Sequence, residues 1–283
     1  MSQHGDRLPA LDGVVEAGLG TPSEPMLGEM LTTAASMRRH LNRFMASYEF
    51  AMQEVETKVK ILRQEFELLN RPNPIEHVSC RLKTLESVVT KARQRGCGPS
   101  TDEIRRVVQD IAGVRVVCSF VSDVYRVQEM LCSHADVELL AIKDYIAHPK
   151  PSGYRSLHAI IEVPVFLSDA VISVPVEMQF RTVAQDFWAC LEHKIFYKYD
   201  REIPAGLSAR LQDAALTAAH LDAEMERLSI EIDEFAASSA TDAPAVHTVT
   251  DASVASFLEL LATHRERGLD AGQVDGTGGD PWD

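Results

Sequence analysis

Residues 144–158, DYIAHPKPSGYRSLH, combine side chains that could hold a charged, planar ligand. Tyr154 offers a flat aromatic face, Lys150 offers positive charge and His158 offers a titratable ring nitrogen. The prolines and Gly153 restrict the backbone or let it approach a ligand closely. An aromatic face beside cations suits a purine nucleotide, which stacks through its base and pairs through its phosphates. The alternative is an ordinary connection between strands that carries a chance cluster of polar residues.

Two acidic residues stand at or within predicted strands. Asp110 precedes the β-branched run at 111–121, and Glu177 lies within the segment VPVEMQFRT. Carboxylates at strand ends that face one cleft can hold Mg²⁺ between phosphates, although a capping aspartate and a solvent-facing glutamate would give the same pattern. Strand alternation places Glu177, Gln179 and Arg181 on one face, opposite their apolar neighbours. This face is therefore expected to meet either water or a site.

A local excess of positive charge precedes both acids. Residues 77–95 contain one acid, Glu86, and five basic residues, namely Arg81, Lys83, Lys91, Arg93 and Arg95. On a helical projection Arg81, Lys91 and Arg95 fall within about one quadrant, whereas Lys83 points elsewhere. The formal net charge of −14 is concentrated in residues 200–283, which carry 17 acidic and 5 basic side chains. The central region is thus neutral enough to bind polyanions.

The apolar pattern predicts the elements that would position these residues. From Leu41 to Leu69 apolar residues recur in alternating steps of four and three, which predicts a helix over 27–69 with a heptad seam. A second helix is expected at 75–95 and a short one before Asp110. Further along, strands are predicted at 111–121, 136–146, 154–163 and 172–182, and helices at 122–134 and 183–199. The order fits an α/β fold with a small mixed sheet and helices on one or both faces.

The two ends of the chain are expected to lie outside this sheet domain. Residues 1–25 are rich in Gly and Pro and lack periodicity, which predicts disorder. A second heptad-like run at 207–235 predicts a C-terminal helix over 205–236, used for packing or oligomerisation. Residues 237–283 are expected to form a linker, a short helix at 254–267 and an acidic tail.

Composition excludes several other classes of protein. No apolar run is long enough to span a membrane, and the N-terminus lacks the pattern of a signal peptide. Five scattered cysteines without a CxxC pair indicate reduced thiols in a cytoplasmic protein, not a zinc site or a disulfide framework. Glycine-rich phosphate motifs are absent.

Four ordered blocks of sequence closely resemble one known family. The blocks are EHVSCRLKTLESVVTKARQR, QDIAGVRVVCSF, DYIAHPKPSGYRSLH and VEMQFRTVAQDFWACLEHKIFYKY, within residues 75–200. They resemble the small alarmone synthetases, the stand-alone synthetases of the RelA/SpoT family of (p)ppGpp enzymes. The resemblance implies a synthetase domain over 26–200, with a mixed sheet related to that of nucleotidyltransferases. It also implies transfer of the β,γ-pyrophosphoryl group of ATP to the ribose 3′-oxygen of GTP or GDP, with release of AMP.

The resemblance assigns roles on the donor side of the reaction. Asp110 matches the family's Mg²⁺-binding aspartate, and Glu177 matches a glutamate that binds metal or activates the 3′-hydroxyl. Arg81 and Arg115 match arginines that sandwich adenine. The positions near the ATP phosphates are matched by Lys83, Lys91 and Arg95.

On the acceptor side, Tyr154 resembles the tyrosine stacked on guanine, with Lys150 and His158 near the acceptor phosphates and Gln179 in the same guanine-nucleotide site. Asp186 stands where some relatives carry asparagine. A carboxylate there could accept from the N1–H and the exocyclic amine of guanine, which predicts that Asp186 selects guanine over adenine.

The same comparison sets expectations for the whole protein. No His-Asp hydrolase motif precedes the synthetase blocks, so synthesis of the alarmone without its hydrolysis is expected. The flanking heptad runs predict a homo-oligomer, as in relatives that form tetramers. Whether GMP, GDP or GTP is the preferred acceptor stays open. A catalytically silent nucleotide- or RNA-binding regulator and a helical oligomerisation protein are the rival interpretations.

Overall fold

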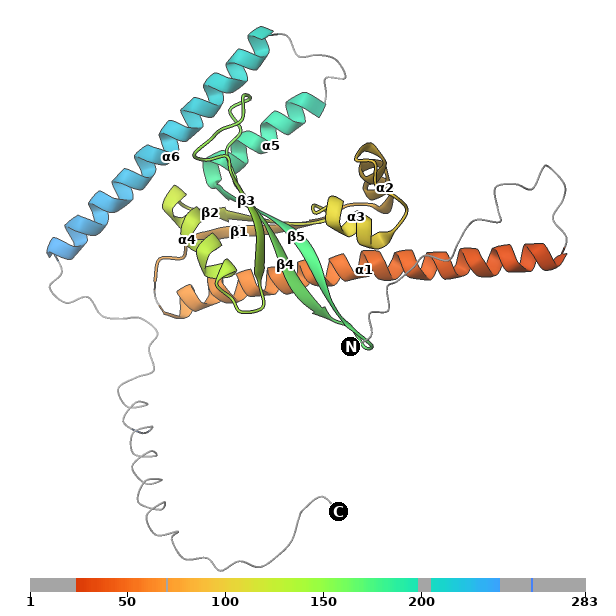
Figure 1. The fold of residues 1–283 in the computed structure, drawn as a ribbon. Coiled ribbons are helices and arrows are strands. Elements are labelled where there is room, and N and C mark those ends of the chain that lie inside the picture. Colours follow the sequence, from red (N-terminus) through yellow and green to blue (C-terminus); the bar gives the residue numbers. More distant parts are fainter. Residues whose placement is uncertain (1–23, 70, 198–204, 240–255, 257–283) are drawn as a thin grey trace, which may run out of the picture.

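The computed structural model describes residues 24–69, 71–197 and 205–239, together with residue 256 (Figure 1). Its helices are α1 (Glu24–Leu68), α2 (Leu85–Gln94), α3 (Thr101–Val107), α4 (Val121–Cys132), α5 (Val183–Tyr197) and α6 (Ala205–Ser239). Its strands are β1 (Ile75–Leu82), β2 (Ala112–Cys118), β3 (Glu138–Asp144), β4 (Leu157–Phe166) and β5 (Val171–Thr182). Within these residues no helix is long and apolar enough to cross a membrane. A mixed α/β fold, as predicted, is confirmed.

The five strands form one sheet in the order β1-β2-β5-β4-β3. Only β2 and β5 run parallel, and the other neighbouring pairs are antiparallel. The register sets Arg81 of β1 opposite Gly113 of β2, and Gly113 opposite Glu177 of β5. Residues that lie far apart in the sequence are therefore brought into one row across these three strands.

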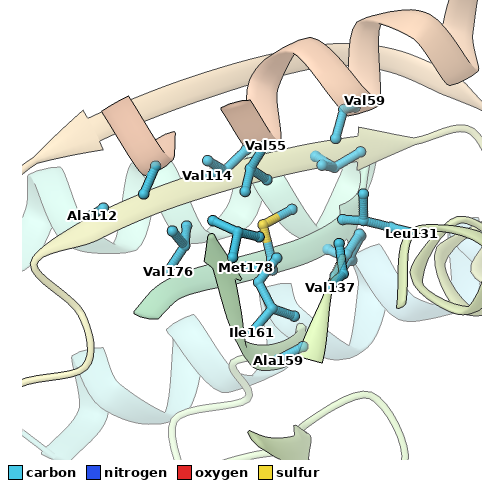
Figure 2. Close-up of a cluster of buried hydrophobic side chains, with 14 of the residues drawn as sticks. Val55, Val59, Ala112, Val114, Leu131, Val137, Ala159, Ile161, Val176 and Met178 are labelled. Atoms are coloured by element: carbon cyan, nitrogen blue, oxygen red, sulfur yellow. The ribbon is translucent and has the colours of Figure 1, made fainter. Parts of the chain in front are cut away.

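The hydrophobic core lies between one face of the sheet and α1. Figure 2 shows Val55 and Val59 of α1 beside Val114, Val176 and Met178, and all five side chains are buried. The predicted heptad seam of α1 thus packs into the chain's own core. Because side chains alternate along a strand, Glu177 and Gln179, which alternate with Val176, Met178 and Phe180 on β5, point to the other face, as predicted. In Figure 1, α5 and α6 lie on that other side.

The prediction of a helix over 75–95 is wrong in its first half. Residues 75–82 form the edge strand β1, so the sheet has five strands instead of the four predicted. Thr84 then caps the N-terminus of α2, where its side chain accepts a hydrogen bond from Ser87 N at 3.3 Å. Arg81 accordingly lies on a strand, and Lys91 lies on a helix. Asp110 precedes the second strand of the chain, not the first.

The other predicted elements are confirmed, with shifted ends. Strand β4 begins at Leu157, so Tyr154 belongs to the preceding loop and not to the strand. The C-terminal helix α6 extends to Ser239, three residues beyond the predicted end. The prediction of disorder over 1–25 is wrong for its last two residues, because Glu24 and Pro25 lie in the first turn of α1. Its remaining residues, 1–23, and the short helix predicted at 254–267 lie outside the described residues, apart from residue 256.

Candidate active site

A cleft of about 520 Å³ opens over the polar face of the sheet, where β1, β2 and β5 meet α5. Seven of the predicted site residues line it, namely Arg81, Lys83, Asp110, Arg115, Tyr154, Glu177 and Gln179. Four more contact that lining, namely Lys91, Lys150, His158 and Asp186. Arg95 lies apart from them. It is exposed, and its guanidinium donates to the backbone carbonyl of Val107.

A second open cavity of about 570 Å³ lies between α1 and the β4–β5 connection. Its charged residues include Arg43 and Asp169, which pair with each other at 3.0 Å (Nη1 to Oδ2). Its wall also includes Phe50 and Phe166. None of the predicted site residues lines it, and it gathers no excess of cations. The cleft over the sheet is therefore the candidate active site.

Asp110 lies between two lysines in the turn that leads into β2. Lys83 Nζ donates to Asp110 Oδ2 at 2.9 Å, and Lys91 Nζ donates to the same oxygen. Burial of the Asp110 carboxyl raises its pKa, but the hydrogen bonds and charges of Lys91 and Lys83 outweigh this effect. The pKa of Asp110 therefore lies below its ordinary value, and the side chain is a carboxylate at neutral pH.

The second oxygen of Asp110 is suited to a cation. Asp110 Oδ1 is buried and, among the described residues, it has no hydrogen-bond partner. Glu177 is close enough for the Asp110 charge to raise its pKa. Mg²⁺ is commonly held by one or two carboxylates together with substrate phosphates and water. Asp110 and Glu177 therefore fit a Mg²⁺ site that a bound nucleotide completes.

Glu177 lies in the middle of β5, with donors on both sides. Gln179 Nε2 donates to Glu177 Oε2 at 2.9 Å, and His158 Nδ1 of β4 lies 3.5 Å from Glu177 Oε1. Burial raises the pKa of Glu177, but the hydrogen bonds from His158 and Gln179 lower it by more than burial raises it. The pKa of Glu177 therefore lies below its ordinary value. The predicted catalytic glutamate is thus ionised and held in one orientation.

The loop between β3 and β4 presents Tyr154 to the cleft. Its backbone is fixed by hydrogen bonds from Lys150 N to Tyr154 O at 3.1 Å and from Gly153 N to Lys150 O at 2.8 Å. The Tyr154 hydroxyl lies 2.7 Å from His158 Nε2, and Lys150 Nζ lies 4.7 Å from the centroid of the Tyr154 ring. The three residues predicted for the acceptor side therefore form one contiguous group.

Arg181 belongs to the site but was not among the predicted site residues. Its side chain is only 8% exposed, and its guanidinium donates to the Tyr154 hydroxyl at 2.7 Å and to Gln179 Oε1 at 3.1 Å. Strand alternation had placed Arg181 on the same face as Glu177. A buried arginine on that face would be expected to pair with an acid nearby, and Asp186 is five residues further on.

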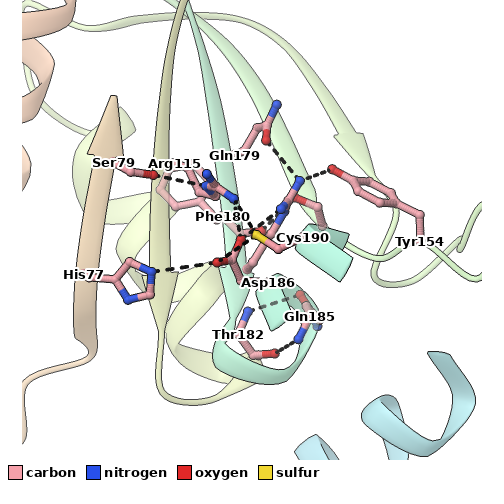
Figure 3. Close-up of polar contacts among 12 residues, drawn as sticks. His77, Ser79, Arg115, Tyr154, Gln179, Phe180, Thr182, Gln185, Asp186 and Cys190 are labelled. Atoms are coloured by element: carbon pink, nitrogen blue, oxygen red, sulfur yellow. Dashed lines mark hydrogen bonds and ion pairs between the residues drawn. The ribbon is translucent and has the colours of Figure 1, made fainter. Parts of the chain in front are cut away.

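Asp186, in the first turn of α5, is the acid that Arg181 meets. Asp186 Oδ1 accepts from Arg181 Nη1 at 3.0 Å and from Arg115 Nη1 at 2.7 Å (Figure 3). Burial raises the pKa of Asp186, but the hydrogen bonds and charges of Arg115 and Arg181 outweigh burial and hold it below its ordinary value. Its predicted role in guanine selection stays a prediction.

The cleft thus brings two carboxylates and several cations together over a mixed sheet. This arrangement is typical of phosphoryl-transfer sites, which must neutralise polyanionic substrates and the charge that develops between them. Sequence comparison narrows this class. The profile of the region found in RelA and SpoT proteins matches residues 80–202.

Two known relatives match over most of their length. GTP pyrophosphokinase YwaC of Bacillus subtilis is 47% identical over 66% of this chain and 89% of its own. GTP pyrophosphokinase YjbM of the same organism is 40% identical over 68% of this chain and 90% of its own. The crystal structure of small alarmone synthetase 1 from Bacillus subtilis, bound to its product pppGpp, superposes with a TM-score of 0.64. It shares 38% identity over 69% of this chain and 99% of that chain. This protein therefore belongs to the RelA/SpoT family, among its small alarmone synthetases.

Proposed function

We propose that this protein is a GTP pyrophosphokinase that transfers the β,γ-pyrophosphoryl group of ATP to the ribose 3′-oxygen of a guanine nucleotide, forming (p)ppGpp and AMP. The observation that carries the proposal is the meeting of Asp110 and Glu177, from separate elements, in one cleft lined by cations. The YwaC and YjbM relatives, both named GTP pyrophosphokinases, support the assignment.

ATP would occupy the side of the cleft formed by β1, β2 and α2. Arg81 and Arg115 come from neighbouring strands and both line the cleft, so their guanidinium planes can hold adenine between them. Lys83 and Lys91 are the cations nearest to Asp110, and we assign them to the phosphates. Arg95 would reach the phosphates only after it leaves the Val107 carbonyl.

The guanine nucleotide would occupy the side formed by the loop before β4. Tyr154 supplies the stacking face, and Lys150 and His158 lie on and beside its ring. Lys150 is an exposed cation on a flexible stem, so it can move from the ring to the acceptor phosphates. Gln179 completes the acceptor side through its contacts with Glu177 and Arg181.

In the reaction, the 3′-oxygen of the acceptor forms a bond to the β-phosphorus of ATP as the bond from that phosphorus to the oxygen of AMP breaks. The hydroxyl proton passes to water in the same step. Because the pKa of Glu177 is lowered, Glu177 is a weak base at neutral pH, so its expected role is to orient the hydroxyl. Holding the two substrates in line supplies much of the rate enhancement.

Asp110 and Glu177 would hold Mg²⁺, which supplies positive charge between the phosphates of the two nucleotides. The lysines on Asp110 Oδ2 leave its other oxygen for this role.

We further propose a homo-oligomer, with a tetramer as the expected size, that acts in the cytoplasm, where ATP and GTP are made. The oligomer is supported by the apolar side chains that α5 and α6 expose. Those on α6 include Leu221, Met225, Leu228, Ile232 and Phe235.

The test is incubation of the purified protein with ATP, Mg²⁺ and either GMP, GDP or GTP, followed by anion-exchange separation of the products. A guanosine carrying a 3′-pyrophosphate, with one AMP for each, is expected from at least one acceptor. Absence of such a product with all three acceptors would favour the silent regulator instead. Incubation with the purified product alone tests the expected absence of hydrolase activity.

A further inference from the structure

The carboxylate of Asp186 lies at the centre of a polar network that crosses the floor of the cleft (Figure 3). One oxygen, Oδ1, accepts from Arg115 on β2 and from Arg181 on β5. The other oxygen, Oδ2, faces Cys190 Sγ and His77 Nε2, each at 3.8 Å. The side chain of Asp186 is 13% exposed, so most of its surface already contacts protein.

The first arginine leads to the donor side. Arg115 Nε donates to Ser79 Oγ of β1 at 3.1 Å, and its Nη1 reaches both Asp186 and Cys190 Sγ. A guanidinium held on two sides in this way keeps a fixed plane. A fixed plane is what stacking on a purine requires.

The second arginine leads to the acceptor side. Arg181 donates to the hydroxyl of Tyr154, and its Cζ lies 5.1 Å from the centroid of the Tyr154 ring. It also donates to Gln179, which in turn donates to Glu177. The orientation of Arg181 therefore fixes both the stacking ring and the predicted catalytic carboxylate.

Without the Asp186 carboxylate these two arginines would lose their shared counter-charge. Arg181 is almost fully buried, and its Nε already has no hydrogen-bond partner among the described residues. Two guanidiniums that share one carboxylate oxygen lie close together, so they would repel each other once it was removed. A buried charge that loses its partner is strongly unfavourable, so the side chains would rearrange.

We propose that Asp186 is a positioning residue, which orients Arg115 and Arg181 and thereby couples the ATP side of the cleft to the guanine-nucleotide side. This inference rests on the proposed function for the identity of the two ligands. It differs from the predicted role in base selection, because recognition of both the N1–H and the exocyclic amine of guanine needs both carboxylate oxygens, and Oδ1 already accepts from two arginines.

Two variants and a control test the proposal. Asp186→Ala removes the bridge, and Asp186→Asn keeps one oxygen acceptor without the charge. Asp213→Asn, an exposed aspartate on α6, is the matched control. For each protein kcat and KM are measured for ATP and for GDP, and kcat/KM is compared for GDP and IDP, which lacks the exocyclic amine of guanine.

Asp186→Ala is expected to raise the KM for ATP and the KM for GDP together, each by about tenfold or more, since hydrogen bonds to charged groups are lost on both sides. The ratio of kcat/KM for GDP over IDP is expected to stay within about twofold of the wild-type value, since no base contact is removed. Asp186→Asn is expected to give an intermediate loss, and Asp213→Asn none.

Other outcomes overturn the proposal. A collapse of the GDP/IDP ratio with an unchanged KM for ATP would assign Asp186 to base recognition. A lower melting temperature with both KM values unchanged would assign it to stability alone. If the wild-type protein makes no alarmone, the proposed function fails. Calorimetric titration with ATP and with GDP separately would still test whether Asp186 positions Arg115 and Arg181 for binding. Equal affinities in wild type and Asp186→Ala would then refute this positioning role.

Discussion

Three carboxylates in the cleft have pKa values below the ordinary range, and each owes this to different partners. Asp110 is held by lysines, Glu177 by an imidazole and an amide, and Asp186 by two arginines. Each of these carboxylates therefore has hydrogen-bond donors within the cleft itself. Nucleotide phosphates would compete with Asp110 for Lys83 and Lys91, which would free Asp110 Oδ2 for a cation.

The first prediction concerns Asp110. Asp110→Asn is expected to lower kcat by about 100-fold or more, because it removes a charge that can hold Mg²⁺ while it keeps the shape of the side chain. The measurement is the initial rate of alarmone formation as a function of Mg²⁺ concentration, with Asp213→Asn as control. Removal of Mg²⁺ by a chelator should abolish wild-type activity. Full activity of Asp110→Asn at low Mg²⁺ would contradict the site assignment.

The second prediction concerns pH. Because the pKa of Glu177 is lowered, its carboxylate form persists above the ordinary glutamate pKa of about 4.3 and is lost only as the pH falls below it. The profile of kcat should therefore show no acidic limb from Glu177 between about pH 6 and 8. An acidic limb near pH 6 in the wild-type profile that is absent from Glu177→Asp would contradict the prediction. His158→Asn removes one of the groups that lower the pKa of Glu177, so any limb from Glu177 should move to higher pH in this variant.

At the residue scale, the sequence pattern singles out Asp110 and Glu177 because each stands at or in a predicted strand, and the family resemblance supplies their roles. The structure brings both residues to one cleft. Arg181 was placed on the correct face but received no role, since the alternation of a strand does not show which cation is buried. The pairing of Asp186 with Arg115, 71 residues away, depends on the parallel pairing of β2 with β5, which no local pattern contains.

At the scale of elements, the stretch 75–95 shows why the sheet was incompletely predicted. Apolar residues at 78, 82, 85 and 89 follow helical spacing, yet the first two lie on β1. Residues 75–82 form a strand because they pair with β2, which is the only neighbour of this edge strand. This pairing partner lies about 35 residues away, so the local apolar spacing does not reveal it. The long helices α1 and α6 were predicted correctly, because the apolar periodicity that indicates a helix lies within the segment itself.

The third prediction concerns the contact between α6 and the acceptor loop. Gly153 has φ of +91°, and a Cβ there would lie 2.5 Å from Ala215 Cβ of α6. Gly153→Ala is therefore expected to lower the free energy of unfolding by about 1–3 kcal/mol and to weaken GDP binding, since the loop carries Tyr154. Urea unfolding and calorimetric titration measure the two effects.

Gly96→Ala is the matched control for Gly153→Ala. Gly96 also has positive φ, +70°, but a Cβ there meets nothing within 4 Å. Gly96→Ala should therefore lower the free energy of unfolding through backbone strain alone, without a steric clash, and should leave the affinity for GDP unchanged. Ala215→Gly in the Gly153→Ala background should restore part of the loss. Equal GDP affinity in wild type and Gly153→Ala would show that the contact does not position the loop.

The fourth prediction concerns Asp222, which attaches α6 to the start of α5. Thr182 Oγ1 donates to Asp222 Oδ2 at 2.7 Å and accepts from Gln185 N, while Gln185 Oε1 accepts from Thr182 N, which completes a capping box. Burial raises the pKa of Asp222, with a further rise from the charge of Glu226. The charged form is therefore less stable in the folded protein than in the unfolded one.

Asp222→Asn keeps an acceptor for Thr182 without the buried charge. It is expected to raise the urea midpoint of unfolding at pH 7, where wild-type Asp222 is ionised. The advantage should shrink as the pH falls through the raised pKa and vanish below the ordinary value of about 3.9, because Asp222 is then protonated in both states. A lower midpoint for Asp222→Asn at pH 7 would mean that the charge itself stabilises the contact.

At the scale of the whole molecule, the two long helices use their seams differently. Tyr48, Val55 and Val59 of α1 are fully buried in the chain's own core. On α6, by contrast, Ala215 and Asp222 are buried, but Leu221 and Phe235 are 53% and 74% exposed. The sequence pattern of the two seams is the same, so only the tertiary arrangement distinguishes a seam that is buried within the chain from one that stays exposed.

The fifth prediction follows from that exposed seam. An exposed apolar stripe of this length is expected to be buried against other copies of the chain. Light scattering at micromolar concentration should therefore give a mass above that of a monomer. Leu228→Glu combined with Ile232→Glu should dissociate the assembly, whereas Glu231→Gln, exposed between them, should not. A monomeric wild type would refute the oligomer and leave the assignment of the cleft intact, because every residue assigned to the cleft comes from one chain.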